Sequence, residues 1–268
     1  MPRRLDVVIV SYNTSADTLA CLASLVAPPP RDLSTILVVD NASTDGTVEA
    51  VRRAWPQVEI VALQRNGGFA AANNAGFERA TAPLVLLLNS DTIVPAGAID
   101  ALADRLEATG AVAAGPRLVN DAGRPEVSFG RMLTPAAEAA QLVRGRLARS
   151  SAAWARRRTE RRVSEEREVD WVSGACLLVR RDAAHAAGLF DERFFLYEED
   201  VDFCAALRAR GGRVLFTPHA TVVHRGGRSG APRSGAYDRS HVLFYEKHAP
   251  HWAPWLRAWL RVRGRPVR

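Results

Sequence analysis

The alternation of short apolar runs with longer helical patterns is the feature that most limits how this chain can fold. It runs through the first 120 residues and is typical of βαβ units, so it predicts a largely parallel sheet covered by helices. The predicted strands are 6–10, 35–39, 58–63, 84–88 and 111–115. The predicted helices are 16–26, 47–54, 69–80 and 97–109. We therefore expect an α/β fold.

The pattern changes in the second half of the chain. Residues 131–168 are rich in alanine and arginine, which we interpret as an insertion of helices and loop. A second ordered block follows, with strands predicted at 171–179 and 214–217 and helices at 182–187 and 199–210. A length of 268 residues suits one integrated domain. We divide it into a first half at 1–120, an insertion at 121–170, a second half at 171–230 and a basic aromatic tail at 231–268.

The chain is basic, with a formal net charge of +7 and a pI of about 10.1. This charge favours anionic partners such as nucleotide phosphates, lipid head groups or nucleic acid. The three cysteines lie far apart without C-x-x-C spacing, which argues against a disulfide framework and favours a reducing cytosol. No stretch approaches the ~20 apolar residues of a membrane-spanning helix. We expect a cytoplasmic protein, either soluble or peripheral at the inner face of the plasma membrane.

Polar residues follow three of the predicted strands at the point where each strand ends. In chain order they are Ser11, Tyr12 and Asn13; Asp40 and Asn41; and Asn89, Ser90 and Asp91. Any one of these groups could be only a turn with a helix cap, since Ser, Asn and Asp are common at caps. Ligands of open parallel sheets bind outside the carboxyl ends of the strands. Three polar strand ends on one sheet edge therefore predict a ligand site there.

A glycine-containing loop leads from the third predicted strand into a helix. It reads Asn66, Gly67, Gly68 and Phe69, with Asn73 one turn further on. Such glycines let backbone N–H groups approach a ligand closely, and a helix N-terminus favours phosphate. The loop has neither the G-x-G-x-x-G spacing of dehydrogenases nor a G-x-x-x-x-G-K-[ST] phosphate loop.

Asp91 is a candidate metal ligand because it follows residues 84–88, a run apolar enough for a strand buried on both faces. A carboxylate in that position suits Mg²⁺ or Mn²⁺, which prefer oxygen ligands and commonly bind substrate phosphates as well. The alternative is a helix cap. His224 precedes Arg225, two glycines and Arg228, and together they form a candidate diphosphate and metal site.

An acidic cluster, Glu198, Glu199, Asp200 and Asp202, begins the helix predicted at 199–210. The helix dipole alone accounts for one or two acids in a first turn. A carboxylate there could also remove a proton from an acceptor hydroxyl, and burial among carboxylates would raise one pKa toward the working range. The inner face of this helix is predicted to carry Val201, Cys204 and Leu207.

Taken in order, these motifs resemble the family-two inverting glycosyltransferases of the GT-A fold, particularly rhamnosyltransferase-like members that build bacterial surface polysaccharides. The resemblance runs from residue 7 to about 229 and depends on the order of the set. Its parts are VIVSYN at 8–13, VVDNASTDG at 38–46, NGGF at 66–69 with the asparagines at 73–74, LLNSD at 87–91, GA at 174–175, FF at 194–195, EDVD at 199–202, and His224.

The resemblance implies a fold, an activity and a set of site residues. The fold is a Rossmann-like, mostly parallel central sheet with a smaller mixed sheet on the acceptor side. The first half would bind a nucleotide-diphosphate sugar, and the second half would bind the acceptor and catalyse transfer. Nucleotide-sugar binding falls to Ser11, Tyr12, Asn13, Asp40, Asn41, Asn66, Gly67, Gly68, Phe69, Asn73, Asn89 and Ser90. The donor/acceptor pocket falls to Trp171, Gly174 and Ala175.

By the same resemblance, Asp91 and His224 are the metal residues for Mg²⁺ or Mn²⁺, and Asp200 is the base, with Glu199 as the alternative. Asn89 departs from the family's D-x-D motif, because an amide stands where the first acid is usual. The implied reaction is a metal-dependent single displacement that inverts the anomeric carbon. The implied donor is dTDP-rhamnose or a UDP-sugar. The implied acceptor is a glycan or a polyprenyl-diphosphate-linked sugar of the cell wall, without nucleic acid.

Three alternatives stay open at this point. A sugar-phosphate nucleotidyltransferase also uses a nucleotide fold, but it is expected to carry a Gly-rich, basic loop after its first strand, where this chain has Ser11 to Thr14. A nucleic-acid-binding domain explains the basic charge alone. The tail interleaves Trp252, Trp255 and Trp259 with arginines, which suits a membrane interface or an exposed helix with its tryptophans packed on the domain.

Overall fold

A computed structural model describes residues 5–226 and 233–265 of the chain. The elements of the first half are β1 Leu5–Ser11, α1 Ser15–Val26, β2 Leu33–Asp40, α2 Thr47–Ala54, β3 Glu59–Ala62, α3 Gly68–Arg79, β4 Leu84–Asn89, β5 Thr92–Ile93, α4 Ala98–Thr109 and β6 Ala113–Val119. Those that follow are β7 Phe129–Gly130, α5 Pro135–Arg149, α6 Ala153–Val163, β8 Arg167–Val169, β9 Trp171–Val172, β10 Cys176–Arg180, α7 Arg181–Ala187, α8 Glu199–Ala209, β11 Val214–His224, α9 Arg233–His248 and α10 Ala253–Val262.

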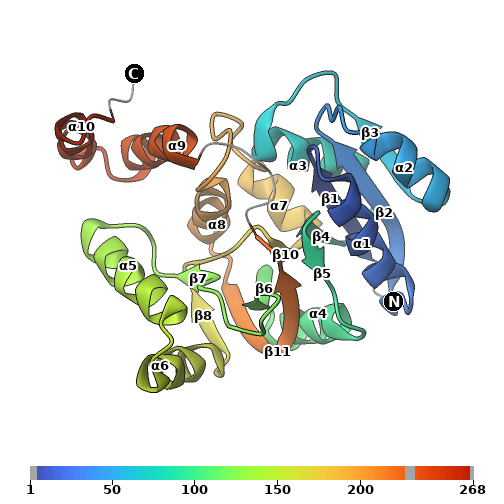
Figure 1. Cartoon of the computed structure of the whole chain (residues 1–268), viewed down its shortest axis with the longest axis horizontal. Coiled ribbons are helices and arrows are strands. Elements are labelled where there is room, and N and C mark those ends of the chain that lie inside the picture. The colour runs from blue at the N-terminus through green and yellow to red at the C-terminus, as the bar shows by residue number, and fades with distance from the viewer. Residues whose placement is uncertain (1–4, 227–232, 266–268) are drawn as a thin grey trace.

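Within the described residues, the central sheet has nine strands in the order β3-β2-β1-β4-β10-β6-β11-β5, with β8 paired to β11 (Figure 1). Strands β3, β2, β1 and β4 are parallel, as the sequence predicts. Strand β10 is antiparallel to β4 and β6, which inserts a strand of the second half between two strands of the first. The smaller sheet is the antiparallel pair β7–β9. The α/β fold class is confirmed.

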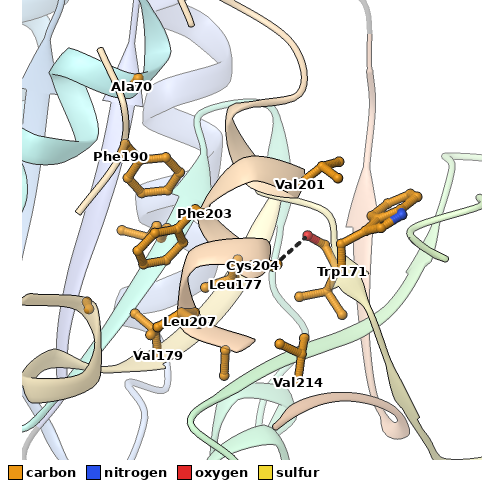
Figure 2. Close-up of a cluster of buried hydrophobic side chains, with 14 of the residues drawn as sticks. Ala70, Trp171, Leu177, Val179, Phe190, Val201, Phe203, Cys204, Leu207 and Val214 are labelled. Atoms are coloured by element: carbon orange, nitrogen blue, oxygen red, sulfur yellow. Dashed lines mark hydrogen bonds between the residues drawn. The ribbon is translucent and has the colours of Figure 1, made fainter. Parts of the chain in front are cut away.

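The two faces of the central sheet form two separate cores, because successive side chains of a strand point to opposite faces. In β1, Val7 and Ile9 pack with α1, α2 and α4, whereas Val8 and Val10 pack with α3, α7 and α8. Figure 2 shows the second core, where Val201, Phe203, Cys204 and Leu207 of α8 meet strand residues such as Leu177 and Val179. The predicted inner face of this helix is confirmed, since Val201, Cys204 and Leu207 are all buried.

The two strands predicted in the second half differ from the observed ones, and the strand predicted at 111–115 is observed as β6 at Ala113–Val119. The strand predicted at 171–179 is interrupted by a turn at residues 173–175, because Ser173 N–H bonds to Ser128 O and Gly174 N–H to Asp200. The strand predicted at 214–217 continues to His224, since its second part pairs with β6 and β5. The extension carries His224 to the edge of the sheet.

The end of the chain forms two helices, α9 and α10, of which the sequence analysis predicted neither explicitly. Figure 1 places them with α5 and α6 on the left of the view, on the opposite side of the sheet from β2 and β3. Helix α9 contributes Phe244 and Tyr245 to the core, and α10 contributes Ala253. No helix within the described residues is long and apolar enough to cross a membrane.

Candidate active site

The loops after β1 and β2 are tied together by side-chain hydrogen bonds. Asn13 Oδ1 accepts the N–H of Thr44 at 2.8 Å, and Asn13 N–H donates to Ser43 Oγ at 2.9 Å. The buried Asp40 accepts Ser43 N–H through Oδ2 at 2.9 Å, while its Oδ1 is buried without a partner. Ser11 is fully buried, and its hydroxyl bonds to Thr14 and Thr18. Its side chain therefore stabilises the loop after β1 from inside the protein.

Asn41 joins the end of β2 to the glycine loop. Its Oδ1 accepts Gly67 N–H at 2.9 Å, and its Nδ2 donates to Asn66 Oδ1 at 2.9 Å and to Gly68 O at 3.1 Å. Gly68 N–H in turn donates to Asn66 Oδ1 at 3.0 Å. Amide oxygens of the chain itself accept both of these backbone N–H groups in the structure, and their contact with a ligand stays a prediction.

A glycine is needed at position 68 because the backbone there lies directly against the backbone of Phe195. Its φ is +89°, and a Cβ on it would lie 2.3 Å from the carbonyl oxygen of Phe195. Phe69 N–H donates to that same oxygen at 2.8 Å. The side chain of Phe69 also lies next to Gly174, where a Cβ would come within 3.3 Å of the Phe69 ring and of Asp200 Cβ. The start of α3 thus lies against the start of α8.

Asp91, His224 and Glu126 form a chain of polar contacts on the β4 side of the site. His224 Nε2 lies 3.4 Å from Asp91 Oδ1, and its Nδ1 lies 2.9 Å from Glu126 Oε2. Burial lowers the pKa of His224, but the two carboxylates outweigh burial and raise it to about 9. A carboxylate that orients a histidine toward an acidic ligand is the usual outer partner of a metal site. Glu126 was not among the predicted site residues, because it lies in an irregular loop segment without a motif.

The pairing of β11 with β5 brings these residues together. His224 pairs with Thr92, and Arg225 N–H donates to the backbone oxygen of Asp91 at 2.9 Å. Arg225 also contacts Asp121 through its guanidinium, at 3.3 Å. Among the described residues, no three His, Cys, Asp or Glu side chains are arranged to hold a metal by themselves. Gly227 and Arg228 of the predicted diphosphate site lie outside the described residues.

Asp200 and Glu199 are adjacent but have different environments. Asp200 accepts the N–H groups of Gly174 and Val201, each at 2.8 Å, whereas Glu199 Oε2 is buried without a partner. Burial raises the pKa of Asp200, and the two backbone N–H groups oppose that rise. Burial and then the charge of Asp200 raise the pKa of Glu199 well above its usual value. The two backbone N–H groups therefore make Asp200 the easier of the two to ionise.

The turn at 173–175 joins the two halves of the site. Gly174 contacts Asp200, and one residue later the oxygen of Ala175 accepts Asn89 N–H at 3.0 Å. The side chain of Ala175 is buried in the core on the other face, so it contributes only backbone. Trp171 is buried, and its indole N–H donates to Arg131 O at 2.9 Å. Of the three predicted pocket residues, Gly174 is the one in contact with Asp200.

Buried oxygens without a hydrogen-bond partner gather among the predicted site residues. Native proteins leave few such atoms, and those that exist require a reason such as a ligand. These oxygens are Asp40 Oδ1, Asn73 Oδ1, Asn89 Oδ1, Glu198 Oε2 and Glu199 Oε2.

The remaining predicted site residues are Tyr12, which is half-buried in the loop after β1, and Ser90, whose hydroxyl bonds to Thr14 at 2.9 Å.

A second polar cluster, missed in the sequence analysis, supports the acidic turn from the side of α9. Buried His241 lies between two glutamates, with Nδ1 2.6 Å from Glu198 Oε1 and Nε2 3.2 Å from Glu138 Oε2. The hydroxyl of Tyr245 donates to Glu138 as well. Burial lowers the pKa of His241, but the glutamates outweigh it and raise the pKa to about 10. This cluster connects α5, α8 and α9.

Asp202, the last acid of the cluster, is a structural anchor. Its side chain is buried, with Lys247 Nζ 2.9 Å from one oxygen and His248 Nε2 2.6 Å from the other. Lys247 also pairs with Asp191 at 2.8 Å. The acidic cluster therefore divides into Asp200 and Glu199 at the site and Glu198 and Asp202 in contacts with α9.

The chain is similar in sequence to a known protein family and to several curated proteins. Residues 6–187 match the family described as Glycosyl transferase family 2. The chain is 35% identical over 283 aligned positions to the N-acetylglucosaminyl-diphospho-decaprenol L-rhamnosyltransferase of Mycobacterium tuberculosis, with 96% of this chain and 89% of that protein covered. It is 26% identical to the O-antigen biosynthesis protein RfbC of Myxococcus xanthus, of which it covers 20%.

Solved structures share the fold at lower identity. The structure of GalNAc-T7 with UDP, GalNAc and Mn²⁺ aligns with a TM-score of 0.66 at 17% identity, over 91% of this chain and 48% of that one. The chain thus spans about half of GalNAc-T7. The mannosyltransferase PcManGT of Pyrobaculum calidifontis, solved with GDP-Man and Mn²⁺, aligns with a TM-score of 0.63 at 21% identity, over 96% and 69% of the two chains.

Proposed function

This chain belongs to glycosyl transferase family 2 and is a glycosyltransferase, and we propose that it transfers L-rhamnose from a nucleotide-diphosphate donor to a sugar carried on a polyprenyl diphosphate. The relative from Mycobacterium tuberculosis supports both substrates, because its name specifies an N-acetylglucosaminyl-diphospho-decaprenol acceptor and an L-rhamnosyl group. The observation in the structure that carries the proposal is the environment of Asp200. Two backbone N–H groups donate to its carboxylate, and it lies near Phe69 of the glycine loop. The basic charge alone favours a nucleic-acid-binding protein, and such a function leaves the polar strand ends and the acidic cluster unexplained.

The donor lies, in this proposal, at the ends of β1, β2 and β4. The buried oxygens of Asp40, Asn73 and Asn89 lack partners there, and hydroxyl or N–H groups of a nucleotide sugar would satisfy them. The amides of Asn41 and Asn66 keep the glycine loop closed against β2. We assign Tyr12, Asn13 and Phe69 to the surface around the nucleotide.

Asp91 and His224 are proposed to hold a divalent cation, Mg²⁺ or Mn²⁺, with Glu126 orienting the histidine. The arrangement fits such a cation, since a carboxylate oxygen and an imidazole nitrogen lie 3.4 Å apart and the imidazole is held from its other nitrogen. When bound, the cation would neutralise charge on the nucleotide diphosphate as it departs. Both GalNAc-T7 and PcManGT were solved with Mn²⁺.

Asp200 is proposed to take the proton of the acceptor hydroxyl. As the hydroxyl oxygen forms its bond to the anomeric carbon, the bond from that carbon to the nucleotide diphosphate breaks, and the configuration inverts. A general base works best when its pKa lies near the working pH, and burial moves the pKa of Asp200 in that direction. Glu199, which keeps its proton, leaves Asp200 as the single negative charge of the pair.

Two measurements test the proposal. In a thermal-shift experiment we expect dTDP-rhamnose with Mn²⁺ to raise the unfolding temperature more than UDP-GlcNAc or GDP-mannose, since a ligand of the folded state stabilises it. In a transfer assay we expect one deoxyhexose to be added to an N-acetylglucosaminyl-diphospho-polyprenol. Binding of UDP-GlcNAc in preference to dTDP-rhamnose, or transfer only to water, would contradict the donor or the acceptor respectively.

We also propose that the protein works at a membrane surface, as a lipid-linked acceptor requires. Exposed tryptophans lie on α6 and α10, with Trp154 65% and Trp255 72% exposed. Arginines surround them, including Arg263, which lies 4.3 Å from the centre of the Trp259 ring. Tryptophan beside arginine suits the head-group layer of an anionic membrane. The cytoplasmic face of the plasma membrane is the proposed location.

A further inference from the structure

A half-open cavity of about 720 Å³ lies between helices α5 and α6 and is lined by none of the site residues described above. Its volume lies within the range of about 300–1,000 Å³ typical of small-molecule sites. One carboxylate lines it, that of Glu165, which is paired with Arg167 at 2.9 Å. The arginines that line it are Arg144, Arg158, Arg161, Arg162 and Arg167. The cavity therefore carries a strong excess of positive charge.

Arg162 shows that this charge is not compensated by the protein. Its side chain is half-buried, its guanidinium lies 4.9 Å from the centre of the Phe129 ring, and its Nε is buried without a hydrogen-bond partner. Burial, and then the charges of Arg144 and Arg167, lower its pKa to about 10, which leaves it protonated at neutral pH. Among the described residues, no carboxylate forms an ion pair with Arg144, Arg158 or Arg162. An anion in the cavity would relieve this repulsion.

The rest of the lining is apolar, which limits what kind of anion fits. The apolar side chains come from α5, from α6 and from the strand before them, and they include Phe129, Val143, Leu147 and Val163. An inorganic anion would gain nothing from such a wall. An amphiphile would place its charged group on the arginines, which bind phosphate oxygens in pairs, and its hydrocarbon on the apolar side chains.

The lining of the cavity is connected through β7 and β9 to the turn that contacts the candidate base. Phe129 in its lining pairs with Val172 across β7 and β9, and Ser128 O accepts the N–H of Ser173. The next residue, Gly174, donates to Asp200. Val172, which pairs with Phe129, is thus only two residues before Gly174 in the chain. A ligand in the cavity could therefore present an attached sugar to Asp200.

We propose that the α5–α6 cavity binds the diphosphate and the first isoprene units of a polyprenyl-diphosphate-linked acceptor. The inference rests on the proposed function, because it supplies the acceptor-side contact for the same reaction. The arginines hold the diphosphate, the apolar wall holds the isoprene chain, and the sugar extends toward Asp200. A phospholipid is less well matched, since its single phosphodiester charge would leave several arginines of the cavity uncompensated.

Farnesyl diphosphate, a short isoprenoid diphosphate, is the probe for the test. We expect the full chain to bind it, and we expect the double variant Arg144→Gln/Arg158→Gln to bind it about tenfold more weakly by calorimetry. The control is Arg156→Gln/Arg157→Gln, which removes the same charge from exposed positions of α6 outside the cavity and should change the affinity less than twofold. Unfolding temperatures of both variants check that they fold.

Other ligands separate the outcomes. We expect inorganic diphosphate and farnesol each to bind far more weakly than farnesyl diphosphate, because each lacks half of the contacts. Equal affinity of both variants for farnesyl diphosphate, or equal binding of inorganic diphosphate, would overturn the proposal. So would loss of phosphatidylglycerol vesicle binding by the cavity variant with farnesyl diphosphate binding intact, which would assign the cavity to a phospholipid.

Donor binding distinguishes failure of this inference from failure of the proposed function. Both double variants should bind dTDP-rhamnose as the wild type does, since the cavity lies outside the donor loops. A chain that binds dTDP-rhamnose but shows no difference between the variants would refute the cavity and keep the function. A chain that binds farnesyl diphosphate through the cavity but no nucleotide sugar would refute the proposed function alone.

Discussion

At the scale of single residues, neighbouring side chains of the same type have different chemistry because their partners differ. Asp200 receives two backbone N–H groups that stabilise its charge, while Glu199, one residue earlier, is buried with an oxygen that has none. The sequence presents them only as two acids at a helix start. Gly67 and Gly68 are a similar pair, since only Gly68 has a positive φ and lies against a backbone carbonyl.

Asp200→Asn should lower kcat by about 10²–10⁴, the usual contribution of a positioned general base, with donor binding unchanged. Glu199→Gln should keep kcat within about threefold, because the proton it retains is not needed for transfer. The acid limb of kcat/KM should lie above the usual aspartate pKa of about 3.9 in wild type and in Glu199→Gln, since burial raises the pKa of Asp200 and the base is active only when ionised. Loss of that limb in Glu199→Gln would assign the base to Glu199.

Glu126→Gln should weaken Mn²⁺-dependent binding of the nucleotide sugar about 10- to 100-fold, the usual effect of removing the group that orients a metal-binding histidine. Calorimetry with and without Mn²⁺ measures it. Glu160→Gln is the control, because Glu160 lies on α6, pairs with Arg117 of β6 and is half exposed. Unchanged Mn²⁺ dependence in Glu126→Gln would exclude His224 from the metal site.

Gly68→Ala should destabilise the fold by about 2–3 kcal/mol and weaken donor binding. Two costs contribute, a side chain at φ +89° and the clash with Phe195 O. Gly97→Ala is the matched control, since Gly97 has φ +75° with nothing within 4 Å of the added carbon, and we expect about 1 kcal/mol. Denaturant unfolding gives both values, and equal losses would show that the Phe195 contact costs nothing.

At the scale of elements, α9 is the helix that holds the acidic turn in place. Tyr197 and Glu198 have φ values of 73° and 64°, which are unfavourable for residues with side chains. His241 of α9 contacts Glu198, and Lys247 and His248 of the same helix contact Asp202. Helix α9 therefore contacts the start of α8 at two acidic side chains. A strained turn persists only when its surroundings hold it, and α9 supplies those contacts.

The His241 cluster should make stability depend on pH. The folded pKa of about 10 lies above the unfolded value near 6.5, so the stabilisation is fully present below pH ~6.5 and is lost as pH rises toward 10. The groups that face the ring are Glu198, Glu138, Tyr237 and Tyr245. Denaturant unfolding between pH 6 and 10 should show this slope in wild type.

His241→Gln should reduce that slope, and the exposed His219→Gln should keep it. Parallel curves for wild type and His241→Gln would show that the imidazole gains no charge-dependent stabilisation from the two glutamates. The kcat of His241→Gln is a second measure, since a loosened turn should lower kcat with little change in the donor KM.

At the scale of the whole molecule, the proposed donor site and the proposed membrane-facing helices lie on different parts of the structure. Figure 1 places α5, α6, α9 and α10 on the left of the view and strands β1 and β2, whose ends carry the proposed donor site, on the right. Exposed apolar side chains on the left-hand helices include Leu142, Trp154, Trp255 and Val262. A lipid-linked acceptor would approach from this side, while a water-soluble donor could enter from the other.

Trp255→Ser combined with Trp259→Ser should lower binding to phosphatidylglycerol vesicles by roughly tenfold in flotation, because each ring contributes interfacial burial. Substitution is a cleaner test than cutting the chain before His248, since that cut removes a partner of Asp202. Neutral vesicles are the control and should bind wild type weakly. Equal flotation of variant and wild type would show that α10 does not contact the membrane.

The sequence by itself determined the parallel strands of the first half, the order of the motifs and the candidate site residues. Apolar runs of period two and helical patterns of period 3.6 are local, and the motifs VIVSYN, NGGF and LLNSD are read without any partner. For this reason the parallel strands β3, β2, β1 and β4 agree with prediction. The strand predicted at 171–179 failed because its interruption depends on Asp200, which lies 26 residues from Gly174.

Only the tertiary structure decided which acidic side chains are paired with other side chains and which are left without a hydrogen-bond partner. Glu126 meets His224 across 98 residues, and Glu138 meets Tyr245 across 107, through strand pairing and helix packing that no local pattern encodes. The same packing created the arginine cavity between α5 and α6, which appears in the sequence only as a basic stretch. Chain periodicity specifies which face a residue occupies, whereas its hydrogen bonds and pKa depend on what the folded chain brings to that face.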